Sequence, residues 1–247
     1  HMLNENTETQ KLPLVETLIN DDQIQLFTLM DHTPGQGQFV DVEQFRLYYG
    51  KVRGKSPKEL DWLITDRIAA RRNVETAPLK HLTDRCRRHN IRVASHDDDT
   101  AVKVAWNHSL GVTLAEFPVN LEAARKAHDY GMHVSLGAPN ILRGGSATGN
   151  LSAREAIAAG YGSIICSDYA PVSMLHSGIT LVREGITGIV QMSCMLSHHP
   201  AEATGIQDDY GAIEEGKKAD LVLVDVTDDI PSIQRTFVAG RQVYAAC

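Results

Sequence analysis

The chain has 247 residues, of which 43% are hydrophobic and 22% are charged, and its formal net charge is −7. This composition supplies enough apolar side chains for a sizeable core, and it excludes a disordered, collagen-like or coiled-coil chain. The acidic balance argues against a broad nucleic-acid surface. No apolar run reaches the roughly 20 residues that a bilayer requires. We therefore expect a cytoplasmic chain with no signal peptide, no membrane contact and no nucleic-acid partner.

Five short apolar runs predict β-strands, at Ile24–Met30, Ile91–Ala94, Val112–Ala115, His133–Leu136 and Ser163–Cys166. Between them, periodic apolar positions predict helices over Pro57–Arg72, Thr76–His89, Leu121–Tyr130 and Ser152–Gly160. Asn120 and Ser152 are favourable N-caps, and glycine follows both of these helices, as is common at helix ends. His1-Met2 resembles residues left by a cloning site, so we set this pair aside from the fold.

Strands that alternate with helices are typical of parallel strands joined by crossovers. Two arrangements satisfy this pattern, a doubly wound open sheet and a (β/α)8 barrel, and periodicity alone does not separate them. After Asp168 the pattern changes: Ile179–Leu196 reads as one helix and His199–Gly205 as the start of another. Leu221–Val224 and Phe237–Val243 are strand candidates, with a turn near Gly240-Arg241. We expect an α/β barrel domain over residues 3–205 and a small β element over 206–247.

The cysteines are predicted to be structural. Cys86, Cys166, Cys194 and Cys247 are widely spaced and form no CxxC pair, so neither a disulfide framework nor a cysteine-based metal site is indicated. Three of them fall in helix-like or strand-like runs, where a thiol usually packs as a small apolar group.

Polar residues follow the predicted strands directly. The strand ends carry Asp31-His32, Ser95-His96-Asp97-Asp98-Asp99, Glu116-Phe117-Pro118, Gly137-Ala138-Pro139-Asn140 and Ser167-Asp168. Active sites of parallel α/β folds lie at the carboxyl ends of their strands. Imidazoles and carboxylates that converge there are the ligands of a hydrolytic divalent metal.

Each of these residues also has a simpler interpretation. Asp31 or Asp97 could cap a following helix, and the three consecutive aspartates cannot all be ligands. His32 or His96 alone would more often be an ordinary polar residue, but together with Asp168 at a third strand end they favour a metal site. The remaining histidines in helical or terminal contexts are interpreted as structural or surface residues: His81, His89, His108, His128, His198 and His199.

A glycine-rich stretch, Pro139–Ser152, is a candidate anion site. Its glycines allow close approach of backbone N–H groups to an anion, and the helix that follows offers its N-terminus. Arg143 adds a guanidinium that can bind phosphate through two hydrogen bonds. We predict phosphate contacts from Asn140, Arg143, Gly144, Gly145 and Ser146; a flexible loop is the alternative. The stretch matches neither the P-loop nor the dinucleotide fingerprint.

Several of these segments together resemble one family. They are Leu29–Gln36, Ala94–Asp98, Ala115–Pro118, Gly137–Asn140, Arg143–Ser146 and Ser167–Tyr169, with the later stretch Ile213–Leu223. In this order they are similar to the branch of the amidohydrolase superfamily that contains the α-D-ribose 1-methylphosphonate 5-triphosphate diphosphatases of the carbon–phosphorus lyase pathway. The resemblance runs from about Leu12 to Tyr244.

The resemblance implies a metal-dependent (β/α)8 barrel with a small β element, and a reaction that releases pyrophosphate from a ribose 5-triphosphate carrying a phosphonate. It implies His32 and His96 as metal ligands, Asp168 as a ligand that also accepts a proton from water, and Glu116 as a further candidate ligand. His96 and Asp168 are therefore the catalytic candidates. Zn²⁺ is the favoured metal, with Mn²⁺ or Mg²⁺ as alternatives, and a homo-oligomer is left open.

Two parts of the family pattern have no counterpart that we find in the sequence. They are the His-x-Asp of the first strand and an arginine-and-glutamate strand expected shortly before Leu12. We therefore count about five barrel strands and expect a chain that begins partway round the barrel. Whether this chain by itself is active is left open. The rival interpretations are a non-catalytic binding or assembly component and an amidohydrolase that acts on a cyclic amide.

Overall fold

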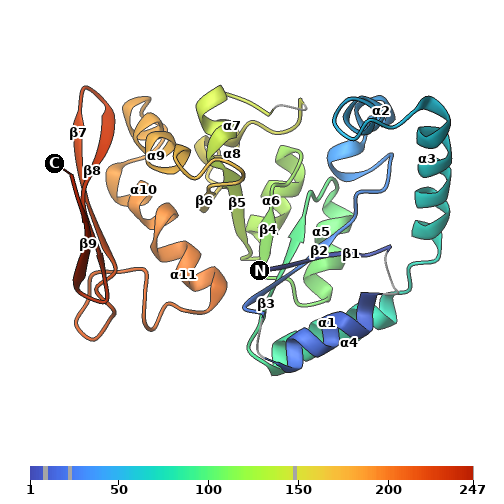
Figure 1. Cartoon of the computed structure of the whole chain (residues 1–247), viewed down its shortest axis with the longest axis horizontal. Coiled ribbons are helices and arrows are strands. Elements are labelled where there is room, and N and C mark those ends of the chain that lie inside the picture. The colour runs from blue at the N-terminus through green and yellow to red at the C-terminus, as the bar shows by residue number, and fades with distance from the viewer. Residues whose placement is uncertain (8–10, 22–23, 147–148, 247) are drawn as a thin grey trace. The chain divides into compact units, whose positions relative to one another are not determined.

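The computed structural model of the chain describes residues 1–7, 11–21, 24–146 and 149–246 (Figure 1). Cys247, one of the four cysteines considered above, lies outside the described residues, as do Ala147 and Thr148 of the glycine-rich stretch. The chain forms two compact units, residues 1–132 and 133–247, which are described in turn.

The first unit is built on parallel strands: β1 (Met2–Glu5), β2 (Leu26–Met30), β3 (Arg92–His96) and β4 (Leu114–Glu116). Each strand pairs in parallel with the next one in the chain. A doubly wound sheet reverses its strand order at a switch point, whereas a barrel keeps it sequential. The sequential order from β1 to β4 therefore favours the barrel arrangement.

Strand β1 is a correction to the predicted set of five strands. Met2, which was set aside, opens this strand and pairs with Phe27, and Glu5 ends it opposite Met30. The strand was not predicted because its burial is the reverse of what the hydrophobicity of its residues suggests: Leu3 is exposed whereas Asn4 is buried. A strand that ends in a glutamate therefore precedes Leu12, but this strand carries no arginine and matches the expected arginine-and-glutamate strand only in part.

Helices connect these strands: α1 (Leu12–Asn20), α2 (Val42–Lys51), α3 (Pro57–Arg72), α4 (Thr76–Arg88), α5 (Ala101–Ser109) and α6 (Leu121–Asp129), with a short 3-10 turn, η2 (Gly37–Phe39). The predictions of α3, α4 and α6 are confirmed, and α1, α2 and α5 were not predicted. α1 and α4 lie side by side (Figure 1). α4 buries Leu79, Leu82 and Cys86, and burial raises the pKa of the Cys86 thiol to about 12, as befits a packed thiol.

α3 begins with a capping box formed by Ser56 and Glu59, a pair whose spacing in the sequence indicates a helix N-terminus. The Ser56 hydroxyl accepts a hydrogen bond from the Glu59 backbone N–H, and the Glu59 carboxylate accepts one from the Ser56 N–H at 2.8 Å. Pro57 occupies the first helical position, where no N–H is needed.

The second unit begins with two parallel strands, β5 (His133–Gly137) and β6 (Ile164–Cys166), which pair with each other. Two short helices, α7 (Ala138–Arg143) and α8 (Ala153–Ala158), connect them. The prediction of α8 within Ser152–Gly160 is confirmed. α7 was not predicted, because its six residues lie inside the stretch that the glycines marked as a loop.

The single helix predicted over Ile179–Leu196 is wrong. The structure has α9 (Ser173–Arg183) and α10 (Ile189–Leu196), followed by α11 (His198–Thr204). The chain adopts a positive φ of 69° at Gly185, which ends α9, and Gly188 is extended before α10. Apolar periodicity continues across this break, so the pattern alone does not show it.

The chain continues with an antiparallel sheet of β7 (Leu221–Thr227), β8 (Ile230–Val238) and β9 (Arg241–Ala245). The strand predicted at Leu221–Val224 is confirmed within β7, whereas the region predicted at Phe237–Val243 spans the end of β8, a turn and the start of β9. The turn lies at Ala239-Gly240, one residue earlier than expected, and both residues have a positive φ. The predicted domain boundary at residues 205 and 206 falls directly after α11 and stays a prediction.

Candidate metal centre

The carboxyl ends of the strands in the first unit carry acidic and histidine side chains. Glu5 ends β1, His32 follows β2 by two residues, His96 ends β3 and Glu116 ends β4. His96 and Glu116 are directly opposite in the strand register. The prediction that polar residues gather at this edge therefore holds for His32, His96 and Glu116 within this unit.

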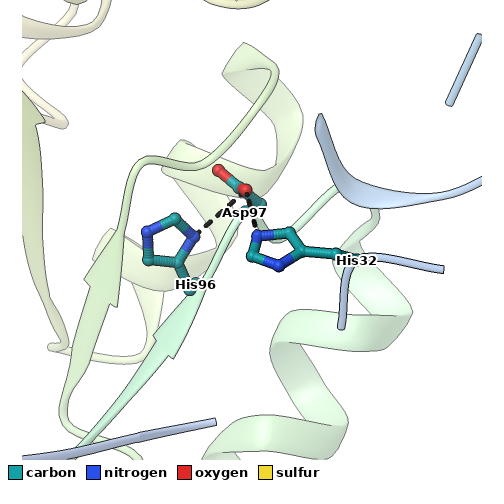
Figure 2. Close-up of side chains that lie close together, drawn as sticks. All are labelled: His32, His96 and Asp97. Carbon is teal, nitrogen blue, oxygen red and sulfur yellow. Dashed lines mark ion pairs between the residues drawn. The ribbon is translucent and has the colours of Figure 1, made fainter. Parts of the chain in front are cut away.

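Asp97 joins the two histidines (Figure 2). Its Oδ2 atom lies 3.1 Å from Nδ1 of His96 and 3.5 Å from Nε2 of His32. The two imidazole rings are 5.8 Å apart between centroids and nearly perpendicular. One nitrogen of each ring and one Asp97 oxygen lie within 4.8 Å of one another. This is the only group of three or more potential ligands that is so arranged among the described residues.

The donor set of this group fits a divalent metal. His32 Nε2, His96 Nδ1 and Asp97 Oδ2 are buried, and within the described part of the chain none has a hydrogen-bond partner of suitable geometry. Buried polar atoms normally have hydrogen-bond partners, whereas these three face one another as ion pairs, an arrangement that also suits ligands around one cation. Imidazole nitrogen and carboxylate oxygen are ligands that Zn²⁺ and Mn²⁺ accept. The residues present could therefore hold such an ion.

Glu5 fixes the orientation of His32. One carboxylate oxygen lies 3.1 Å from Nδ1 of the ring, and the other accepts a hydrogen bond from the His32 backbone N–H at 3.0 Å. With Nδ1 occupied in this way, Nε2 is the ring nitrogen that faces Asp97. A carboxylate behind a ligating histidine is a common supporting contact in metal sites. This role of Glu5 was not predicted from the sequence, because β1 lacks an apolar pattern.

The pKa values of the cluster reflect close opposite charges. For His32, burial lowers the pKa, but the carboxylates of Asp97 and Glu5 outweigh burial and raise it to about 9. For Asp97, burial raises the pKa, but contacts with His32 and His96 outweigh it and lower the value to about 2. Without a metal, the cluster is therefore a buried ion-pair network.

The three consecutive aspartates have three different partners. Asp97 faces the histidines, Asp98 accepts a hydrogen bond from the Ser95 hydroxyl at 2.6 Å, and Asp99 accepts one from the Gly37 N–H at 2.8 Å. Burial raises the pKa of Asp98 to about 6. Asp97 has a left-handed backbone with φ 55°, which turns the chain at the end of β3. This arrangement agrees with the expectation that not all three are ligands. Asp97 is a candidate ligand that was not among the metal ligands predicted from the sequence.

Asp31, the other aspartate interpreted as a cap, is buried and has a structural role. Its carboxylate pairs with Arg71 of α3 and accepts hydrogen bonds from the backbone N–H and the hydroxyl of Thr33. These contacts hold the segment from which His32 projects.

Glu116 stays a predicted ligand. It is buried, and burial raises the pKa of its carboxyl group. Its Oε2 lies 3.8 Å from Nε2 of His1, and it is not a member of the three-residue group around Asp97.

Asp168 belongs to the second unit, where it follows β6. Its side chain is exposed, and its φ of 50° is left-handed, as is that of Asp97 after β3. It therefore occupies the same position relative to its strand that the sequence analysis expected. Its role as a ligand and proton acceptor stays a prediction.

The predicted phosphate-binding residues surround the end of α7. The backbone N–H groups of Gly144 and Gly145 donate to the carbonyls of Ile141 and Asn140 and so close the helix. Gly144 has φ 77°, the usual left-handed conformation at a helix end. These two amides are used within the chain, so phosphate binding through them would require the cap to open. The prediction for this stretch therefore depends on its side chains.

Asn140 and Arg143 differ in their availability. Asn140 ties α7 to α8, since its Oδ1 accepts from the Ala153 N–H at 3.0 Å and its Nδ2 donates to the Leu151 carbonyl at 2.9 Å. Arg143 is exposed at the end of α7, and its Nη1 donates to the Tyr169 hydroxyl. Arg143 is the better-placed residue for an anion. The contribution of Ser146 stays a prediction.

The chain belongs to the amidohydrolase family, whose model matches residues 63–243. It is 35% identical over 246 residues to the alpha-D-ribose 1-methylphosphonate 5-triphosphate diphosphatase of Escherichia coli strain K12. That alignment covers 99% of this chain and 65% of the relative, so the chain spans slightly less than two thirds of the relative's length.

Solved structures show the same fold. Dihydropyrimidinase from Brevibacillus agri has a TM-score of 0.61 at 11% identity, over 99% of this chain and 69% of its own. N-acetylglucosamine-6-phosphate deacetylase from Pasteurella multocida has a TM-score of 0.55 at 15% identity, over 95% of this chain and 72% of its own. The predicted α/β fold of the metal-dependent hydrolase type is thereby confirmed. Within the described residues, no helix is both long enough and apolar enough to span a membrane.

Proposed function

We propose that this chain carries the metal-dependent hydrolase site of a phosphonate-catabolic enzyme, which releases pyrophosphate from a ribose 5-triphosphate with an alkylphosphonate at carbon 1. The observation that carries the proposal is the convergence of His32, His96 and Asp97 on one point. The similarity to the E. coli diphosphatase supports the choice of substrate. Zn²⁺ is the metal we favour, with Mn²⁺ and Mg²⁺ as alternatives.

The metal, when bound, would lower the pKa of a bound water from 15.7 towards about 7 and so supply hydroxide at neutral pH. His32, His96 and Asp97 would hold the ion, with Glu5 orienting His32. Glu116, at the adjacent strand end, is a further candidate ligand.

The residues predicted from the sequence to handle the proton and the leaving group are Asp168, Arg143 and Ser146. Asp168 would accept the proton of the attacking water. Its carboxylate would also orient that water for attack. Arg143 and Ser146 would stabilise negative charge on the departing pyrophosphate.

Metal analysis and an activity assay together test this proposal. The chain is purified without chelator, its Zn, Mn and Mg contents are measured, and pyrophosphate release is followed with the ribose triphosphate. We expect about one equivalent or more of bound metal, and its loss in the His32→Asn, His96→Asn double variant. A wild-type chain that takes up no metal would contradict the proposal.

Two other functions predict different results in the same experiment. A non-catalytic binding component would bind the triphosphate without releasing pyrophosphate at any metal concentration. An amidohydrolase acting on a cyclic amide would hydrolyse that amide, and Arg143→Ala would leave its turnover nearly unchanged. For the triphosphate enzyme we expect Arg143→Ala to lower kcat/KM at least tenfold, the loss typical of a charged transition-state contact.

A further inference from the structure

Arg143 and Tyr169 come from neighbouring strands of the second unit. β5 and β6 are parallel and in register at their carboxyl ends, where Gly137 is opposite Cys166. α7 starts directly after β5 and ends at Arg143, and Tyr169 is the third residue after β6. Both side chains therefore originate at the end of the strands where parallel α/β enzymes bind their substrates.

The two side chains form a direct pair. Nη1 of Arg143 donates a hydrogen bond of 2.6 Å to the Tyr169 hydroxyl oxygen. Arg143 is exposed, and Tyr169 is 71% exposed, so the pair is open to solvent. A large aromatic side chain at that exposure gains little from packing.

The charge of Arg143 is not neutralised within the described residues, where it has no carboxylate partner. Nearby Arg154 provides the contrast: its Nη1 lies 2.6 Å from a carboxylate oxygen of Glu184, and its Nε donates to the Ile141 carbonyl. Arg154 thus has a structural role at the end of α7, whereas the described part of the chain offers Arg143 the neutral phenol of Tyr169 and no carboxylate. A guanidinium in this situation is suited to an external anion.

We propose that Arg143 and Tyr169 together bind the oligophosphate group of the substrate, with Tyr169 as a direct contact that the sequence patterns did not indicate. The phenol oxygen accepts from Arg143, so its own hydrogen is still available to donate. The guanidinium has further N–H groups that can donate to phosphate oxygens. Two donors held 2.6 Å apart match two oxygens of a phosphate chain. This inference rests on the proposed function, since it identifies how that site binds its substrate.

The position of Tyr169 in the chain adds to the argument. It directly follows Asp168, the predicted proton acceptor, whose left-handed backbone turns the chain after β6. Tyr169 and Asp168 therefore both lie in the segment that follows the carboxyl end of β6.

Binding of inorganic tripolyphosphate tests the proposal without any need for turnover. The metal-free full chain is titrated calorimetrically at low ionic strength, as wild type and as Tyr169→Phe and Arg143→Gln. We expect Kd to rise about three- to tenfold for Tyr169→Phe, the cost of one hydrogen bond, and at least tenfold for Arg143→Gln. An unchanged Kd in Tyr169→Phe, or no tripolyphosphate binding by the wild type, would overturn the proposal.

Tyr210→Phe is the matched control. Tyr210 also accepts a hydrogen bond from a cation, at 3.2 Å from Lys218, but that lysine also pairs with Asp209. Its charge is already balanced, so we expect tripolyphosphate affinity within twofold of the wild type. A loss in Tyr210→Phe as large as in Tyr169→Phe would indicate a general surface effect and overturn the assignment.

A double variant separates direct contact from mere support of Arg143. If Tyr169 itself donates to phosphate, Tyr169→Phe weakens binding further in the Arg143→Gln background; if it only positions the arginine, no further loss occurs and the direct contact is overturned. Pyrophosphate release from the ribose triphosphate is measured separately. Tripolyphosphate binding with the expected variant effects but without turnover would refute the proposed function while leaving this inference intact.

Discussion

Glu5 binds His32 at two places, the backbone N–H and the ring Nδ1, although 27 residues separate them in the chain. The contact joins the carboxyl ends of β1 and β2 and leaves Nε2 of His32 directed at Asp97. A strand of only four residues thereby sets the orientation of a candidate metal ligand.

Replacing Glu5 by Gln should weaken metal binding without removing a ligand of the three-residue group. Loss of such a supporting carboxylate typically costs about 10–100-fold in metal affinity. The measurement is a competition titration of Zn²⁺ against a chromogenic chelator. Glu16→Gln is the control, because Glu16 also pairs with a histidine, His81, but on the surface of α1 and α4. Equal Zn²⁺ affinities for both variants would mean that Glu5 has no orienting role.

Asp97→Asn should chiefly lower Zn²⁺ affinity, whereas Asp98→Asn should chiefly lower the free energy of unfolding. Asp97→Asn removes the charged oxygen shared by the two histidines, so we expect Zn²⁺ affinity to fall at least 100-fold. Asp98 is buried, and its carboxylate accepts hydrogen bonds from the Ser95 hydroxyl and the Asn107 side-chain amide. For Asp98→Asn we expect metal binding within fivefold of wild type and a loss of about 1–3 kcal/mol in unfolding free energy. Metal loss confined to Asp98→Asn would contradict the assignment of Asp97.

Gly37→Ala should destabilise the chain near the candidate site. Gly37 has φ 58°, and an added Cβ would lie 3.2 Å from the Asp31 carbonyl oxygen and 3.3 Å from that of Asp97. The left-handed backbone alone costs about 1 kcal/mol with alanine, and crowding adds to this. Gly54→Ala is a matched control with φ 64° and nothing within 4 Å. In urea unfolding, a Gly37→Ala midpoint no lower than that of Gly54→Ala would show that the close approach is unimportant.

The start of α3 should weaken in acid. Hydrogen bonds from the Ser56 backbone and hydroxyl, with Lys55 nearby, lower the pKa of Glu59 from 4.5 to about 2. Because the folded-state pKa is depressed, the stabilisation is present above pH 4.5 and is lost as the pH falls towards 2. Protection factors of the amides in the first turn of α3, the intrinsic exchange rate divided by the observed rate at each pH, should therefore fall between pH 5 and pH 3. In Glu59→Gln that fall in protection should be absent; if it persists, another group is responsible.

The sequence predicted the parts of the candidate site that follow strong strands. His32 and His96 each come directly after an apolar run, and the structure brings their rings together. Asp97 could not be distinguished from Asp98 and Asp99, because the distinction arises from a left-handed turn that composition does not reveal. A clue was available, since aspartate is among the few residues that tolerate such a turn.

The parts that the sequence did not predict have equally local causes. β1 is four residues long and buries Asn4 instead of Leu3, so it lacks an apolar pattern. The end of α7 is closed by Gly144 and Gly145, and glycines that end a helix look in sequence like those of an anion-binding loop. Pairing with β2 therefore defines β1, whereas hydrogen bonds within a single turn define the end of α7.

The left-handed backbone at Asp97 narrows the choice of residues that could stand there. Glycine and asparagine adopt this conformation readily but carry no negative charge, while glutamate has the charge but a longer side chain and less tolerance of the turn. Aspartate thus tolerates the left-handed backbone of the loop and also supplies the negative charge between the two histidines. Almost any other amino acid would lack either the backbone tolerance or the charge.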